Sequence, residues 1–219
     1  MSYTKALLIS SYDDISGLSR GLTYDVIAYF DRVFILEGIY KGFPVNPDHT
    51  NQYMNDYINR LKTIFSGKIS YEVMDGFKQI EKRNRLFEMA KNYNFGLVMD
   101  SDEQIVIDPE ILDGTLSSLM TSAQRCFPVE MINLGSRMFA PRMFKNMNGL
   151  HCKQSTNGQI SHGSIYDEND KEIIHDIWSF RGIQKGEYIN GIKLTHDKEM
   201  RTKQRIIRDC VYQSTVLDR

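Results

Sequence analysis

Two carboxylates one residue apart, Asp100 and Asp102, form the pattern with the clearest chemistry in the sequence. They follow the apolar run Phe-Gly-Leu-Val-Met at 95–99, whose length and composition predict a buried strand. In an extended backbone, residues i and i+2 point to the same side, so both carboxylates are expected to face one spot. Such a pair repels itself unless a cation lies between, and its oxygens suit Mg²⁺ or Mn²⁺, which in turn suit a diphosphate. An acidic turn exposed to solvent is the alternative.

Arg83 lies on the helix that precedes this strand. The apolar spacing predicts a helix over 77–93, and Arg83 comes three residues after Ile80 and four before Phe87. An arginine on or beside an apolar stripe either extends from the edge of the core to solvent or points at an anion. For Arg83 alone, the first interpretation is favoured.

The elements of the amino-terminal part determine where these side chains lie. Short apolar runs at 6–9, 32–36, 69–73 and 95–99 alternate with helical patterns at 16–30, 50–66 and 77–93. Continuous apolar strands separated by helices indicate a parallel sheet covered on both faces. Ligands of such sheets bind outside the carboxyl ends of the strands. Residues 1–103 are therefore expected to form a nucleotide-binding half of an α/β fold.

The pattern becomes weaker after residue 104. We expect a helix at 109–120, strands at 131–134, 137–140 and 192–194, and loops with short strands over 145–172. A basic helix is expected to close the chain, with Lys198, Arg201, Lys203, Arg205 and Arg208 on it. Because neither an internal repeat nor a low-complexity linker is present, we predict one domain over 1–219, its second half (about 104–219) facing the acceptor of any transferred group.

Composition excludes several classes of protein. The 219 residues include 27 Lys+Arg and 28 Asp+Glu, and this near-neutral balance argues against a general nucleic-acid binder. Cys126, Cys152 and Cys210 are odd in number and widely spaced, which excludes a disulfide scaffold and a cysteine zinc site and fits a reducing compartment. No apolar run approaches 18 residues and the first is too short for a signal peptide. We therefore expect a cytoplasmic protein without a membrane span.

The segments 82–90 and 97–103 resemble nucleotide-sugar glycosyltransferases of GT-A fold, and most of all those of family 2. In that family an Arg-Asn pair opens a helix segment ending in Ala, and a hydrophobic strand and an Asp-x-Asp follow. Pro-Arg-Met-Phe-Lys-Asn and Gly-Leu within 141–150 are similar to a Pro-Arg-Leu-Phe-Arg segment of bacterial members, and 192–208 is similar to their C-terminal His and basic helix. The resemblance implies an α/β GT-A (Rossmann-like) fold with a mixed, mainly parallel sheet flanked by helices. It also implies a compact catalytic domain of the bacterial or virus-encoded kind.

The resemblance assigns roles to charged residues. Asp102, helped by Asp100, would hold the Mn²⁺ or Mg²⁺ that bridges the two phosphates of a sugar nucleotide, and His196 would reach the same metal or the phosphates. Arg201 and Lys203 would neutralise the charge on the departing diphosphate. Alternatively, His196 is a hydrogen-bonded core histidine and the two basic residues belong to a solvated helix face.

The resemblance also implies a nucleoside pocket at the strand ends. It would be lined by Ser10, Tyr12, Glu37 and Asp75, with Arg83 close by. Carboxylates suit ribose hydroxyls and the uracil N–H, as an acidic residue does in dinucleotide sites. Acidic residues are also common at strand ends without a function.

One departure from the family pattern concerns the catalytic base. Related enzymes reach a His-Glu pair after the Pro-Arg-Leu-Phe-Arg segment, whereas this chain has Thr-Asn-Gly at 156–158. An inverting transferase needs a carboxylate that takes the proton of the acceptor hydroxyl. Our preferred candidate is Asp176, which lies beside His175 and shortly before Trp178. The other candidates are Asp167, Glu168 and His162. Inverting and retaining outcomes both stay open.

These observations favour a metal-dependent glycosyltransferase. It would move a sugar from a nucleoside-diphosphate sugar, with UDP favoured, to a hydroxyl of a glycan or another acceptor. The first alternative is a nucleotidyltransferase, against which the absence of glycine from 10–14 counts. The second is a non-catalytic sugar- or nucleotide-binding module, which the missing base suggests.

Overall fold

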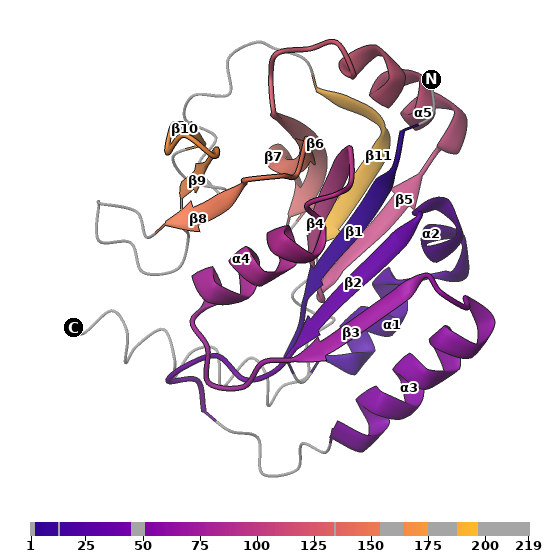
Figure 1. Cartoon of the computed structure of the whole chain (residues 1–219). Coiled ribbons are helices and arrows are strands. Elements are labelled where there is room, and N and C mark those ends of the chain that lie inside the picture. Colours follow the sequence, from indigo (N-terminus) through magenta and orange to yellow (C-terminus); the bar gives the residue numbers. More distant parts are fainter. Residues whose placement is uncertain are drawn as a thin grey trace.

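A computed structural model of the chain describes residues 3–12, 14–44, 51–133, 135–153, 164–174 and 188–196 (Figure 1). The helices are α1 (Ile15–Gly21), α2 (Tyr24–Tyr29), α3 (Asn51–Ile64), α4 (Gln79–Met89) and α5 (Pro109–Leu119). The first strands are β1 (Lys5–Ser10), β2 (Arg32–Glu37), β3 (Ile69–Val73), β4 (Phe95–Asp100), β5 (Glu103–Ile107) and β6 (Cys126–Asn133). They are followed by β7 (Ser136–Lys145), β8 (His151–Lys153), β9 (Ser164–Tyr166), β10 (Glu172–Ile174) and β11 (Ile189–His196).

The main sheet has eight strands in the order β3-β2-β1-β4-β7-β6-β11-β5. The strands β1 to β4 run parallel to their neighbours in this group, and β6 runs parallel to β11. Antiparallel pairs join β4 to β7, β7 to β6 and β11 to β5. A mixed, mainly parallel sheet flanked by helices, as expected from the sequence, is therefore confirmed.

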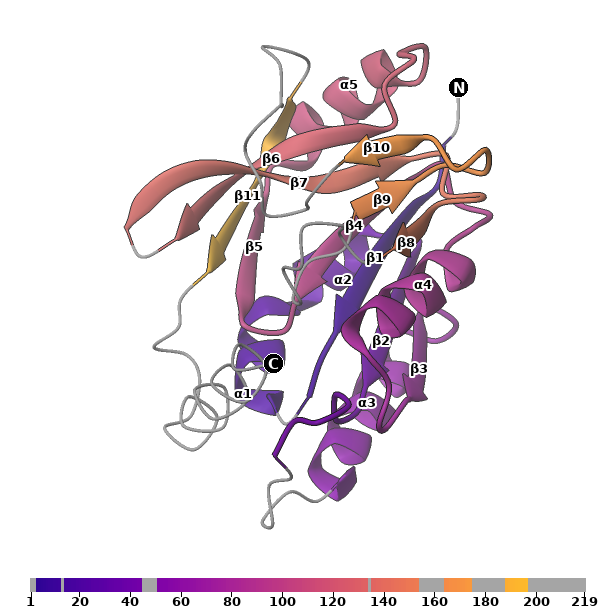
Figure 2. The same ribbon diagram turned by 90° about the vertical axis from the view of Figure 1, so that its left-hand side faces the viewer.

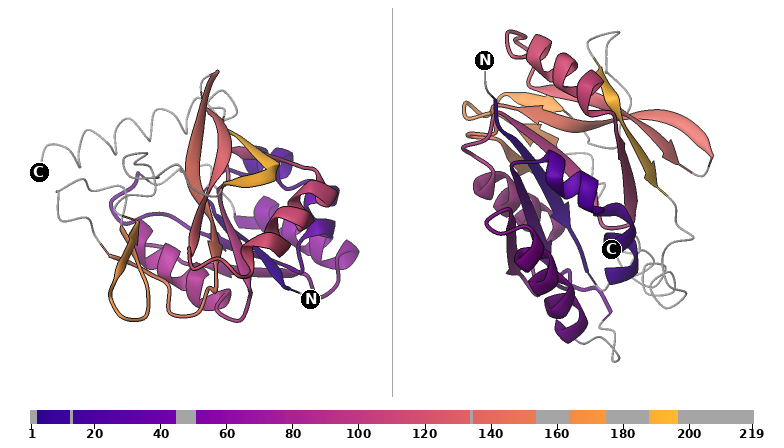
Figure 3. Two further views of the ribbon diagram at one scale, coloured as in Figure 1. Left: turned by 90° about the horizontal axis from the view of Figure 1, so that it is seen from above. Right: turned by 90° about the vertical axis from the view of Figure 1, so that its right-hand side faces the viewer.

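Alternate residues of the parallel strands enter two separate cores. Leu7 and Ile9 of β1 pack with α1, α2, α3 and α5 on one face, whereas Ala6 and Leu8 pack with α4 on the other. The three-stranded sheet β10-β9-β8 lies on the α4 side, and the β6–β7 hairpin extends away from the parallel strands (Figures 2 and 3). Burial of both faces explains why these strands are continuous apolar runs.

Several boundaries differ from those expected. The helical pattern at 16–30 forms two short helices: α1 ends at Gly21, and the Thr23 hydroxyl caps the amino terminus of α2. The helix expected at 77–93 is confirmed in position but spans 79–89. The strands expected at 131–134 and 137–140 correspond to the parts of β6 and β7 next to the hairpin turn, and both strands extend farther from the turn than expected. The strand β5 was not expected.

Two expectations concern the carboxyl-terminal part and the membrane. The basic helix expected over 198–208, with Arg201 and Lys203, lies outside the described residues. Along the described parts of the chain, no helix combines the length and apolar composition that crossing a membrane requires.

Candidate active site

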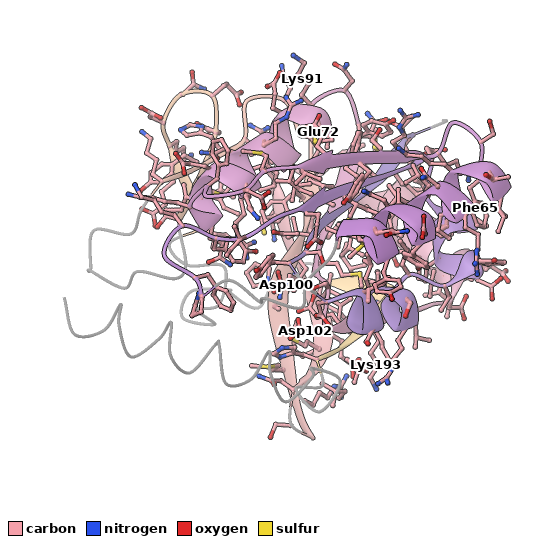
Figure 4. The ribbon with its side chains drawn as sticks, turned by 90° about the horizontal axis from the view of Figure 1, so that it is seen from below. Phe65, Glu72, Lys91, Asp100, Asp102 and Lys193 are labelled. Carbon is pink, nitrogen blue, oxygen red and sulfur yellow. The ribbon has the colours of Figure 1, made fainter. Side chains whose placement is uncertain are left out.

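The carboxyl ends of three neighbouring parallel strands meet at one edge of the sheet. Ser10 ends β1, Glu37 ends β2 and Asp100 ends β4, and Ser10 and Asp100 are paired directly across the two strands. In Figure 4 Asp100 and Asp102 lie close together near the centre of the molecule, whereas Phe65, Glu72, Lys91 and Lys193 lie farther out. The two carboxylates predicted to do chemistry thus lie where ligands of α/β sheets bind.

The backbone that carries the two carboxylates is not extended throughout. The strand β4 ends at Asp100, and Ser101 and Asp102 form a turn before β5. The Ser101 hydroxyl donates a hydrogen bond of 3.0 Å to Oδ2 of Asp14, the residue that caps the amino terminus of α1. The extended backbone expected here is therefore wrong at Ser101 and Asp102, where the chain turns. The two carboxylates still lie close together (Figure 4), but they have different partners.

Asp100 lies between two arginines. Its Oδ2 is 3.2 Å from Nη2 of Arg142 and its Oδ1 is 3.8 Å from Nη2 of Arg83. Burial favours the neutral acid, but the charges of Arg142 and Arg83 outweigh it and lower the pKa of Asp100. The sequence suggested that the charge of the Asp-x-Asp pair needs a bound cation. For Asp100, β7 and α4 supply positive charge through Arg142 and Arg83, and its role as a metal ligand stays a prediction.

Asp102 pairs instead with His196, the last residue of β11. Its Oδ2 lies 3.0 Å from Nε2 of His196, while Nδ1 of His196 lies 3.2 Å from Oδ1 of Asn133. Both side chains are almost inaccessible, with 3% of Asp102 and 8% of His196 exposed. If the Asn133 oxygen accepts the Nδ1 proton, the neutral imidazole turns a lone pair toward the carboxylate. A proton or a cation is then needed between them.

A carboxylate facing an imidazole lone pair is an arrangement that can hold a divalent cation, so the Asp102–His196 pair fits such an ion. The separation of 3.0 Å is that of an ordinary hydrogen bond, so a proton on Nε2 would satisfy the pair as well. Asn133 would orient the imidazole from behind, as partners of metal-binding histidines do. Among the described residues no three His, Cys, Asp or Glu side chains gather into a metal site. Two protein ligands leave the remaining positions to substrate oxygens, as is usual for Mg²⁺.

Glu103, which sequence reasoning did not single out, is fully buried beside Asp100. Its Oε2 accepts the backbone N–H of Asp100 at 2.9 Å, and its Oε1 lies 2.5 Å from Nη2 of Arg142. Burial raises the pKa of Glu103 to about 7, against the opposing effect of Arg142.

Arg142 is another residue of the site that sequence reasoning did not single out. It lies within the Pro-Arg-Met-Phe-Lys segment, and the resemblance of that segment to a known motif was the signal that could have identified it.

The residues predicted to line a nucleoside pocket lie around the loop that follows β2. The Ser10 hydroxyl is 2.8 Å from that of Tyr40, and Oδ1 of Asp75 accepts the N–H of Ile39 at 2.9 Å. Tyr12 is buried, with its ring edge-on to Phe43, and Glu37 is fully buried. Their role toward a nucleoside stays a prediction.

Lys82 is a further buried residue near this loop that sequence reasoning missed. It donates to the carbonyl of Gly38, and its Nζ lies 4.3 Å from the centre of the Tyr40 ring. Since Tyr40 also contacts Ser10, Lys82 links α4 to the ends of β1 and β2.

The candidates for a catalytic base divide into two groups. Asp176 and His162 lie outside the described residues, as do His175 and Trp178. The same holds for Arg201 and Lys203, the residues predicted to contact the diphosphate. Asp167 and Glu168 form the turn between β9 and β10, where Asp167 accepts the N–H groups of Asn169 and Lys171 and Glu168 pairs with Arg125. Those two carboxylates therefore order the hairpin of the small sheet.

Comparisons with known proteins found similarity in structure only. No protein-family model matches the chain, and neither does any curated protein sequence. The structure is similar to S. aureus TarS, with 14% identity and a TM-score of 0.43 over 73% of this chain and 30% of that one. A TarS fragment, residues 1–349, gives 14% identity and a TM-score of 0.40 over 65% of this chain and 47% of the fragment.

A third similar structure is that of GalNAc-T7 with UDP, GalNAc and Mn²⁺. It shares 9% identity and has a TM-score of 0.45 over 89% of this chain and 44% of that one. The chain thus spans less than half the length of each of these three solved chains. Similarity at this level assigns neither a family nor an activity to the chain.

Proposed function

We propose that the protein is a glycosyltransferase that binds a nucleoside-diphosphate sugar together with Mn²⁺ or Mg²⁺ and transfers the sugar to an acceptor hydroxyl. The observation that carries the proposal is the pairing of Asp102 with His196 beside the arginine-bound Asp100, at the carboxyl ends of the parallel strands. A carboxylate and an imidazole that can hold a divalent cation at this sheet edge suit a diphosphate.

Each described residue has a defined part in this proposal. Asp102 and His196 would hold the cation, which supplies positive charge to the diphosphate leaving group. Asp100, with 23% of its side chain exposed, is accessible to the donor, and Arg142 and Arg83 keep it ionised. The motif resemblance supports Arg201 and Lys203 as further partners of the diphosphate and Asp176 as the base that takes the acceptor proton.

The proposal predicts that binding depends on the Asp102–His196 pair. Calorimetric titration with UDP should show binding in the presence of Mn²⁺, and Asp102→Ala should remove it. Asp170→Ala is the matched control, because Asp170 also contacts a histidine, His151 at 2.8 Å, but on the exposed small sheet. Binding that is independent of Mn²⁺ with every nucleoside diphosphate, or that survives in Asp102→Ala, would contradict the proposal.

Turnover separates the proposal from its alternatives. With UDP-sugars and an acceptor panel, we expect metal-dependent release of nucleoside diphosphate, and loss of that release in Asp176→Asn while UDP still binds. Pyrophosphate release from a nucleoside triphosphate and a sugar phosphate would instead identify a nucleotidyltransferase. Binding without any turnover would identify a binding module. Normal turnover in Asp176→Asn would reject Asp176 as the base.

A further inference from the structure

Arg142 occupies an irregular position in β7. Phe127 pairs with Met143 and the next residue of β6, Pro128, pairs with Pro141, so β7 contains one extra residue at this point. That residue is Arg142, and the pairing of two prolines means that neither strand offers an N–H there. A β-bulge re-aims a side chain relative to its neighbours. The bulge explains how an arginine inside a buried strand reaches the end of β4.

The re-aimed guanidinium closes a ring of contacts around Asp100. Its Nη2 contacts Oδ2 of Asp100 at 3.2 Å and Oε1 of Glu103 at 2.5 Å. The other oxygen of Glu103 accepts the backbone N–H of Asp100 at 2.9 Å. The ring therefore fixes the backbone and the carboxylate of the same residue.

The ring also connects Asp100 to the strand that bears the other half of the site. Glu103 is the first residue of β5, and it pairs with His196 of β11 in the sheet. Asp102 lies in the turn between Asp100 and Glu103. Holding Asp100 and Glu103 together thus also fixes the two ends of the turn that presents Asp102 to His196.

The guanidinium itself is out of reach of a ligand. The Arg142 side chain is 0% exposed, whereas that of Asp100 is 23% exposed. We propose that Arg142 is a positioning residue: together with Glu103 it holds Asp100 in place, and it acts on the donor through Asp100. This inference rests on the proposed function. It binds neither donor nor acceptor directly.

Lys145 offers a matched control on the same strand. Its ammonium group is also buried, but it donates to the carbonyls of Leu119, Met120 and Ser122 at the carboxyl end of α5. Lys145→Met removes a buried cation from β7 without touching the ring. It is expected to lower the thermal midpoint and to leave donor affinity within about twofold.

The test combines stability, affinity and coupling. The Nη2 atom of Arg142 contacts both carboxylates, and a lysine, which keeps the charge, ends one bond short of that position. In Arg142→Lys we therefore expect the Kd for UDP at saturating Mn²⁺ to rise about 10- to 100-fold. Because Arg142 acts through Asp100, Arg142→Lys/Asp100→Asn should bind UDP no more weakly than Asp100→Asn alone. A wild-type Kd in Arg142→Lys, or losses that multiply in the double variant, would overturn the inference.

A measurement without ligand keeps this inference distinct from the proposed function. Hydrogen exchange of the Asp100 backbone N–H should accelerate at least tenfold in Arg142→Lys and in Glu103→Gln, and stay unchanged in Lys145→Met. Unchanged exchange in the first two variants refutes the ring even if the wild type binds UDP. A wild type with a protected Asp100 N–H but without Mn²⁺-dependent binding refutes the proposed function, and with it the role of Arg142 toward a donor.

Discussion

Gly17 of α1 packs directly against the turn that carries Asp102, and its replacement by alanine should disturb both stability and binding. A Cβ at Gly17 would lie 2.6 Å from the carbonyl oxygen of Ser101 and 2.9 Å from both carboxylate oxygens of Asp14. The Ser101 oxygen belongs to the backbone, so it cannot rotate away. Either α1 or the turn has to move.

Two opposing terms determine the size of the effect. Alanine in place of glycine within a helix contributes about 1 kcal/mol of stability. Overpacking a closed site costs about 1–3 kcal/mol, and the contact with Ser101 is about 0.8 Å shorter than the 3.4 Å at which ordinary contact begins. We therefore expect Gly17→Ala to lower the free energy of unfolding by about 1 kcal/mol net.

Gly114→Ala is the control for this prediction. Gly114 lies within α5, is exposed, and has nothing within 4 Å of an added Cβ. It should raise the free energy of unfolding by about 0.5–1 kcal/mol, measured by urea titration, and leave UDP binding unchanged. Gly17→Ala should also weaken binding of UDP with Mn²⁺. Equal stability of the two variants, with equal affinity, would refute the packing of α1 against the Asp102 turn.

Three further predictions concern stability and reactivity away from the sheet edge. Asp113→Ala removes the acceptor of hydrogen bonds from the Tyr3 and Tyr29 hydroxyls and from Lys5, and should lower the urea-derived free energy of unfolding by about 1–2 kcal/mol. Asp170→Ala, at an exposed carboxylate, should change it little. Burial raises the pKa of Cys152 to about 11 from 9.0, so the folded chain keeps a proton that the unfolded chain releases. The contribution of Cys152 to stability should be unaffected below pH 9 and fall by about 2 kcal/mol by pH 11. Burial also raises the pKa of Cys126, which adds a fall of the same sign, so Cys152→Ala should make this part of the pH profile less steep. In thiol-labelling experiments followed by peptide mapping, the buried Cys126 and Cys152 should react only as the chain unfolds; rapid labelling of either in the native protein would contradict their burial.

The parallel half of the fold was predictable because its strands are buried on both faces. Such strands are unbroken apolar runs, and those ending at Ser10, Glu37 and Asp100 could be located from composition alone. The same rule placed Asp100 and Asp102 at the ligand-binding edge. The motif resemblance implied that His196 reaches the same metal as Asp102 or the phosphates. The structure places the two side chains 3.0 Å apart, and their role toward a metal stays a prediction.

The antiparallel part was less predictable for identifiable reasons. The strand β5 has the sequence Glu-Gln-Ile-Val-Ile and begins directly after an acidic turn. Two polar residues followed by three apolar ones do not give the alternation that predicts a strand. Pro128 and Pro141 suggest breaks, but they lie opposite each other at a bulge, where no backbone N–H is required. The expected strands were therefore too short.

The ion pairs of the site could not be predicted from the sequence because they join segments that lie far apart along the chain. Asp100 and Arg142 are 42 residues apart, and Asp102 and His196 are 94 apart. Spacing along the chain carries no information on such pairs. The sequence therefore could not show that β7 places an arginine beside Asp100.

Thermal denaturation with UDP and Mn²⁺ tests the central claim most directly. At ligand concentrations about 100 times the Kd, binding stabilises the folded state by about 2.7 kcal/mol, which corresponds to a rise of about 5–10 °C for a chain of this size. We predict this rise with UDP and Mn²⁺ together, little or none with either alone, and none in Asp102→Ala. An unchanged midpoint with every nucleoside diphosphate and Mn²⁺, or an equal rise in Asp102→Ala, would contradict a metal-dependent donor site at Asp102 and His196.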